Sequence, residues 1–352
     1  MRKKLALAAT AGLSTGLGLW IAAAQADAVA VRTDPLAPTL TDPESAGEQR
    51  WVSSADGTRL HVEVHGPKGA PAVVLSHGWT CCTRYWNPQV RELAANYRVI
   101  TYDQRGHGSS ANSRGKYSPA VLADDLAAVL DATLEPEQQA VLVGHSMGAM
   151  SIVAWAGQYP DAVTRQASAA LLASTGVDGL LAESLVVRLP ARWPRTVDLL
   201  GRSVLGMPTP LGGPSPLAYR GVKYAALSPE ASPAQVMFCE EIVLGCGGRA
   251  RGKWGAALSR IDLRESLTNL RVPTTVLVGN ADRLTPPAHA RRLADALRHD
   301  GHLDQLIELP GVGHMSTVEA TARVNAEIRR LLTVESAGTD PTRNAEHTGA
   351  HS

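Results

Sequence analysis

Aromatic side chains and net charge are both scarce in this sequence. Its 352 residues include one Phe, seven Trp and seven Tyr, so a core has to be built mainly from Leu, Val and Ala. Lys and Arg number 34 against 33 Asp and Glu, a net charge of +1. Nucleic-acid-binding proteins carry a basic surplus, so this balance gives no reason to expect such a partner. With 44% hydrophobic and 19% charged residues, the composition is that of a globular protein.

Cysteine is scarce as well, and its spacing argues against one class of site. The four cysteines are Cys81, Cys82, Cys239 and Cys246. No CxxC pair occurs among them, so we expect no zinc site. In an oxidising compartment Cys239 and Cys246 would be able to pair, whereas all four would also fit as small buried hydrophobic residues. The sequence leaves both states open.

The N-terminus carries the pattern of an export segment. Three basic residues, 2–4, precede twenty uncharged residues, 5–24, and a small-x-small motif ends at Ala26. A secretory signal peptide has this order, and the uncharged run is also long enough to span a membrane. We expect residues 1–26 to be a cleaved signal peptide or a retained anchor, so that the folded part is secreted or membrane-associated. A merely structural helix is the remaining alternative.

Apolar runs alternate with helical patterns between two polar ends. Residues 27–48 are rich in proline and polar residues and are expected to be a linker, and residues 335–352 are expected to be a disordered tail. We find no internal repeat. The predicted strands are 59–64, 72–76, 98–102, 139–144, 169–173, 274–279 and 304–309, and the predicted helices are 87–95, 118–131, 147–158, 288–299 and 318–332.

This alternation predicts an α/β fold. Continuous apolar strands separated by helices indicate a mostly parallel sheet that is covered on both faces. We expect this core to comprise residues 49–175 and 260–334. Residues 176–259 interrupt the pattern with clusters of glycine and proline, and they are expected to form a helical cap over the carboxyl ends of the strands.

A candidate nucleophile lies between a predicted strand and a predicted helix. The stretch Gly144-His-Ser-Met-Gly148 fits G-x-S-x-G in the context that the motif needs. The glycines allow a tight turn that projects the hydroxyl of Ser146, and the following helix points its positive end at developing negative charge. The alternative is an ordinary glycine-rich corner.

A serine hydroxyl needs a base, and the base needs a carboxylate. His314 lies in a glycine-rich loop after the last strand, and Asp282 follows the strand at 274–279. The order Ser146, Asp282, His314 is the chain order expected for such a triad. Taken singly, His314 would also fit as a polar loop residue and Asp282 as a turn former or helix cap.

The reaction also needs hydrogen-bond donors for an oxyanion. We expect the backbone N–H of Met147, directly after the nucleophile, and that of Trp79, in Ser76-His-Gly-Trp79. Trp79 would otherwise be a packed wall under the cap. The loop Asp103-Gln-Arg-Gly-His-Gly-Ser-Ser110 is assigned to structure. Asp103 and His107 are not accompanied by a matching cluster of ligands, so we expect no metal site there.

With these motifs in this order, the chain resembles the α/β-hydrolase fold superfamily, over about residues 50–333. It is similar to the lidded branch of serine esterases, lipases and cofactor-free haloperoxidases that is common in actinobacteria. The resemblance implies a sheet of about eight strands, a cap, a triad of Ser146, His314 and Asp282, and acyl transfer through Ser146. It also implies no metal and no cofactor. The family's epoxide hydrolases and haloalkane dehalogenases carry aspartate at the elbow, so Ser146 argues against both.

The expected activity is therefore cleavage of a carboxylic ester, with a small hydrophobic and lipid-like ester as the substrate. Perhydrolysis or C–C bond hydrolysis on the same triad, and a non-catalytic binding protein on the same fold, stay open as alternatives. The acyl and alcohol parts of the substrate depend on the cap, and neither they nor the oligomeric state can be inferred from the sequence.

Overall fold

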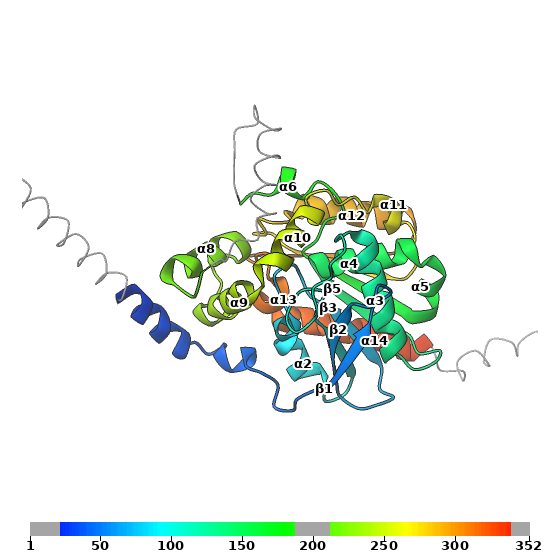
Figure 1. The fold of residues 1–352 in the computed structure, drawn as a ribbon, viewed down its shortest axis with the longest axis horizontal. Helices are drawn as coiled ribbons and strands as arrows, with labels where there is room; N and C mark the ends of the chain where they lie inside the picture. The colour runs from blue at the N-terminus through cyan, green and yellow to red at the C-terminus, as the bar shows by residue number, and fades with distance from the viewer. Residues whose placement is uncertain (1–21, 187–211, 339–352) are drawn as a thin grey trace, which may run out of the picture.

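The computed structural model describes residues 22–186 and 212–338, with side chains to residue 333. Within these ranges eight strands form one sheet in the order β1-β2-β4-β3-β5-β6-β7-β8. Figure 1 shows the sheet with helices packed around it. The pairings β1–β2 and β2–β4 are antiparallel, and all others are parallel. The predicted α/β fold class is confirmed. The strands are β1 Glu48–Ser53, β2 Arg59–His65, β3 Ala72–Ser76, β4 Arg98–Tyr102, β5 Ala140–His145, β6 Ala167–Ala173, β7 Thr274–Gly279 and β8 Leu303–Leu309.

Helices cover both faces of the sheet, and alternate strand residues divide between two apolar clusters. On β5, Leu142 belongs to the cluster that includes residues of α3, α4 and α12, while Val141 and Val143 belong to the cluster that includes residues of α2 and α14. A parallel sheet buried on both faces therefore needs the continuous apolar strands seen in the sequence. The helix bounds are α2 Asn87–Leu93, α3 Pro119–Thr133, α4 Met147–Gln158, α5 Pro160–Gln166, α12 Pro287–His299, α13 Ser316–Glu319 and α14 Thr321–Gly338.

The region between β6 and β7 contains most of the helices that do not flank the sheet. They are α6 Leu180–Glu183, α8 Pro216–Ala226, α9 Pro233–Gly245, α10 Gly248–Leu258 and, just before β7, α11 Arg264–Leu267. Helix α10 is tied to loops at the carboxyl edge of the sheet, because the indole N–H of Trp254 donates to the carbonyl of Arg105 at 3.0 Å. Residues 187–211 of the predicted cap lie outside the described residues.

The segment before β1 is more ordered than the expected linker at 27–48. Residues 22–32 are helical, and a 3-10 helix, η1, spans Ala37–Leu40. Asp34 accepts a hydrogen bond from the N–H of Ala234 at 2.8 Å, and Leu40 is buried. These contacts fasten the segment to α9, which explains why its prolines do not mark a free linker. Residues 1–21, most of the predicted export segment, lie outside the described residues.

Two further boundaries differ from the sequence expectation. The predicted helix 318–332 is divided into α13 and α14 at Ala320, and α14 continues to Gly338, four residues into the expected tail. The rest of the tail, 339–352, lies outside the described residues.

No helix within 22–186 or 212–338 has the length and apolar character to cross a membrane.

All four cysteines are free thiols, so the disulfide between Cys239 and Cys246 that the sequence left open does not form. Cys239 lies inside α9, and Cys246 directly follows that helix. Seven residues along a helix correspond to about 10 Å of rise, which is more than the Cα separation that a disulfide allows. Cys81, Cys239 and Cys246 are buried, in keeping with the alternative of small core residues.

Candidate active site

Ser146 occupies a strained turn between β5 and α4. Its φ is 52° and its ψ is −116°, a region that a non-glycine residue enters only when its surroundings hold it there. A Cβ at Gly144 would lie 2.4 Å from the backbone of Ala149, and one at Gly148 would lie 1.9 Å from the carbonyl oxygen of Ser76. Both motif glycines are therefore required by close backbone approach, which confines the nucleophile turn between β3 and α4.

His314 and Asp282 are brought together from two different loops. His314 follows β8, Asp282 follows β7, and Nδ1 of His314 lies 2.9 Å from Oδ2 of Asp282. Both side chains are buried. The Asp282 carboxylate also accepts the backbone N–H groups of Leu284 and Thr285 and the hydroxyl of Thr285, each at 2.9 Å. The carboxylate is acceptor-only, so His314 donates from Nδ1 and its Nε2 is left as the basic nitrogen.

The residue before the nucleophile connects the elbow to the histidine loop. The ring of His145 lies 4.9 Å from that of His314 between centroids, and its Nε2 donates to the carbonyl oxygen of His314 at 2.9 Å. Burial lowers the pKa of His145 well below its usual value, so the ring is neutral. In the sequence, His145 occupies the first variable position of G-x-S-x-G, and its place inside the motif is the one signal for its role.

The two predicted oxyanion donors border the same turn. A Cβ at Gly78 would lie 3.3 Å from Cβ of Ser146, so the loop that carries Trp79 packs directly on the elbow. Within the described residues, the backbone N–H groups of Trp79 and Met147 donate no hydrogen bond to protein. The indole N–H of Trp79 donates to the carbonyl of Arg251 in α10 at 3.1 Å. The backbone donors are thus held in place with their hydrogen-bonding capacity unused.

The loop after β4 is structural, as its sequence suggested. Asp103 accepts the N–H of Thr83 at 2.7 Å, that of Ser109 at 2.9 Å and Nδ1–H of His61 at 3.0 Å. Arg105 is 1% exposed and forms an ion pair with Asp125 at 2.6 Å. In the part of the chain that the structure describes, no group of three or more His, Cys, Asp or Glu is arranged to hold a metal.

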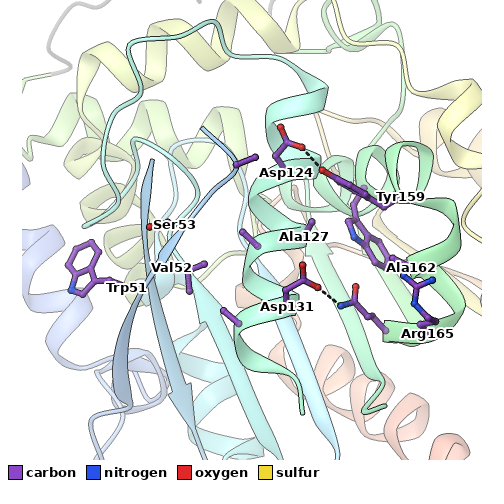
Figure 2. A pocket seen from close by; sticks show the side chains of 14 residues that line it. Trp51, Val52, Ser53, Asp124, Ala127, Asp131, Tyr159, Ala162 and Arg165 are labelled. Atoms are coloured by element: carbon purple, nitrogen blue, oxygen red, sulfur yellow. Dashed lines mark hydrogen bonds between the residues drawn. The ribbon is translucent and has the colours of Figure 1, made fainter. Parts of the chain in front are cut away.

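A separate groove of about 680 Å³ lies between β1 and helices α3 to α5 (Figure 2). Its carboxylates are already engaged, because Asp124 accepts the hydroxyl of Tyr159 at 2.6 Å and Asp131 accepts the amide of Gln166 at 2.7 Å. None of the predicted site residues lines it. The groove is therefore distinct from the site at Ser146.

The chain matches a family model and known proteins over most of its length. The sequence model of the alpha/beta hydrolase family matches residues 73–327. The chain is similar to the bifunctional esterase/perhydrolase DCH of Acinetobacter calcoaceticus, with 28% identity over 77% of this chain and 95% of the relative. It is also similar to a non-heme chloroperoxidase of Burkholderia pyrrocinia, with 28% identity over 79% of this chain and 97% of the relative.

A solved structure extends the likeness to three dimensions. A thermophilic esterase from Thermogutta terrifontis matches with a TM-score of 0.64 and 23% identity, over 81% of this chain and 98% of that one, a level that speaks for the fold alone. The family match covers the nucleophile turn, the Asp282 loop and the His314 loop in one continuous stretch. The chain therefore belongs to the alpha/beta hydrolase family.

Proposed function

We propose that this protein is a serine hydrolase that cleaves carboxylic esters through an acyl intermediate on Ser146. The observation that carries the proposal is the strained turn at Ser146, which the neighbouring His145 links to a buried His314–Asp282 pair whose nitrogen and oxygen lie 2.9 Å apart. Such a pair supplies a base of fixed tautomer, and the turn between strand and helix projects the hydroxyl of the half-buried Ser146 away from the sheet. The similarity to an esterase/perhydrolase gives independent support.

The proposed cycle uses only groups of this chain and water. Nε2 of His314 takes the proton of Ser146 as its oxygen attacks the ester carbonyl, and Asp282 stabilises the imidazolium. The N–H groups of Trp79 and Met147 bind the oxyanion. The imidazolium then protonates the departing alcohol. In the second half, neutral His314 removes a proton from the water that attacks the acyl carbon and returns it to the Ser146 oxygen as the acid leaves.

The substrate class is inferred from the cap, which we propose covers the site from residues 176–259. Leu180 packs against the core and Leu185 is 37% exposed, and the apolar character of this segment is the support for a site that takes an acyl chain. We propose a hydrophobic, lipid-like ester as the substrate. We also propose that the enzyme is exported, because residues 1–26 have the pattern of a signal peptide or anchor. Rates on p-nitrophenyl esters of two to sixteen carbons test the chain length, and a preference for acetate would exclude the lipid-like substrate.

Perhydrolysis is the second candidate. Two similar proteins, the esterase/perhydrolase and the chloroperoxidase, are named for activities beyond ester hydrolysis. In this reaction hydrogen peroxide replaces water in attacking the acyl-Ser146, and the product is a peracid. Measuring peracid formation from acetate and peroxide, beside ester hydrolysis by the same preparation, separates the two activities.

The deciding experiment is fluorophosphonate labelling of the purified protein, with the modified residue located by mass spectrometry and Ser146→Ala as control. Labelling at Ser146 that is lost in the variant supports an activated serine. A folded protein that is not labelled would overturn the proposal and favour a binding protein on the same fold.

A further inference from the structure

Helix α8 ends against the loop that carries His314, here called the histidine loop. The carbonyl oxygen of Ala226, the last residue of α8, accepts the backbone N–H of His314 at 2.9 Å and that of Met315 at 3.1 Å. These are the only backbone donors of the His314 loop directed at α8 among the described residues. The main chain at His314 is therefore held by the region between β6 and β7, hereafter the inserted region, and not only by the sheet.

A carboxylate of α13 strengthens the same contact from the other side. Oε2 of Glu319 accepts the N–H of Ser228 at 2.9 Å, and both carboxylate oxygens lie 3.1 Å from the N–H of Gly313. Ser228 belongs to the turn after α8, and Gly313 directly precedes His314. One side chain thus bridges the inserted region and the loop of the proposed base.

Gly313, Ser228 and Glu319 pack so closely that no free space remains between them. A Cβ at Gly313 would lie 2.5 Å from the backbone nitrogen of Ser228 and 2.8 Å from Oε1 of Glu319. No side chain fits between the loop and the turn, so the three segments are in direct contact. Movement of the carboxylate has to be transmitted to the backbone beside His314.

The groups around the Glu319 carboxylate determine its pKa. Burial raises its pKa, the hydrogen bonds from Ser228 and Gly313 oppose that effect, and the negative charge of Asp282 adds to it. Tyr85 from η2 (Thr83–Trp86) and Cys239 from α9 also face this carboxylate, and both are neutral because burial raises their pKa values far above neutral pH. Among the described residues, the carboxylates around the histidine loop are Asp282, Glu319 and Glu230, whose Oε2 would lie 2.6 Å from a Cβ at Gly311 in the same loop.

We propose that Glu319 is a positioning residue for His314. It acts through the N–H of Gly313 and couples the turn at Ser228 to the orientation and basicity of the imidazole. The inference rests on the proposed function, because it assigns the role through His314 as base. It adds a residue from outside the three triad loops, on a helix where no catalytic motif occurs.

The test compares Glu319→Gln with Glu327→Gln. Glu327 is a buried carboxylate on α14 that accepts the hydroxyl of Thr275 and the amide of Gln305 at 2.9 and 2.8 Å, away from the His314 loop. Both variants lose a carboxylate charge and hydrogen bonds. Glu319 is half-buried, whereas Glu327 is buried and also pairs with Arg330 at 2.7 Å, so Glu327→Gln carries at least as large a structural cost, which thermal unfolding measures for both variants. Only Glu319→Gln is expected to lower kcat, by about tenfold, which corresponds to about 1.4 kcal/mol, with KM changed less than twofold.

The pH profile separates positioning from folding. Loss of the Glu319 charge makes the imidazolium of His314 less favourable, so the acid limb of kcat/KM is expected to move to lower pH in Glu319→Gln and to stay unchanged in Glu327→Gln. Wild-type kcat and an unmoved limb in folded Glu319→Gln would overturn the inference. Because fluorophosphonate labelling of the wild type is measured alongside, failure of the proposed function itself would appear as an unlabelled wild type.

Discussion

Gly148 is the position where one added carbon tests the nucleophile turn most directly. A Cβ there would lie 1.9 Å from the carbonyl oxygen of Ser76 and 2.8 Å from that of His77. Attractive contact between non-bonded heavy atoms requires about 3.5 Å, so α4 and the end of β3 would have to separate by more than about 1 Å. Both obstacles are backbone atoms, which cannot swing away as a side chain would.

The cost of this separation has two parts. Overpacking a buried site typically costs about 1–3 kcal/mol of stability. The movement also pulls the N–H of Met147 away from that of Trp79, and removing one oxyanion donor typically lowers kcat about 10²- to 10³-fold. Gly148→Ala is therefore expected to lower kcat on p-nitrophenyl acetate by about 10²-fold and to unfold at lower denaturant concentration than the wild type.

Gly245→Ala is the matched control. Gly245 ends α9, a Cβ there meets no atom within 4 Å, and alanine is the better helix former. This variant should keep wild-type kcat and stability. If Gly148→Ala retained kcat within about threefold and the same unfolding midpoint, the close approach of α4 to β3 would not govern the oxyanion site, and the reasoning would be refuted.

Three further predictions follow from other contacts. Asp282→Asn should lower kcat about 10³- to 10⁴-fold, because it no longer fixes the His314 tautomer, and a loss below tenfold in steady-state assays would contradict this. The pKa of His61 is raised by its hydrogen bond to Asp103, so the bond stabilises the fold fully below the unfolded pKa of about 6.5, and that stability is lost as pH rises through the folded value. The difference in unfolding free energy between wild type and His61→Gln should therefore shrink from pH 6 to pH 9, and a constant difference would count against the bond. Because the four cysteines are free, a reductant should leave Tm unchanged, and Ellman's reagent should detect four thiols in denaturant; fewer would indicate a disulfide.

The elements that sequence predicted well are those whose own side chains carry the signal. The strands β3, β4 and β7 have the predicted bounds because a strand buried on both faces has to be apolar throughout. Strand β1 was missed because only Val52 of its six residues is buried, which leaves no alternating pattern. The loops at Asp282 and His314 were predictable because each follows such an apolar strand and is punctuated by glycine.

The contacts that position the site were much harder to infer. Ala226 acts through a carbonyl oxygen, which every residue has, so its role has no signature in the sequence. Glu319 bonds the backbone of Ser228, 91 residues earlier in the chain, and no spacing rule connects two such positions. These interactions follow from how the inserted region packs on the core, which local patterns do not encode.

The two halves of the proposed chemistry are held by different parts of the molecule. The N–H of Ser146 donates to the carbonyl of Ala173 at 2.9 Å, which extends the β5–β6 pairing past the strand end, so the sheet itself fixes the nucleophile. His314 is held by the elbow through His145, and in addition by Ala226 and, through Gly313, by Glu319. A change in the inserted region can therefore alter the base while the serine turn stays in place. Substrate-dependent packing of that region would act on proton transfer and not on the geometry of the nucleophile turn.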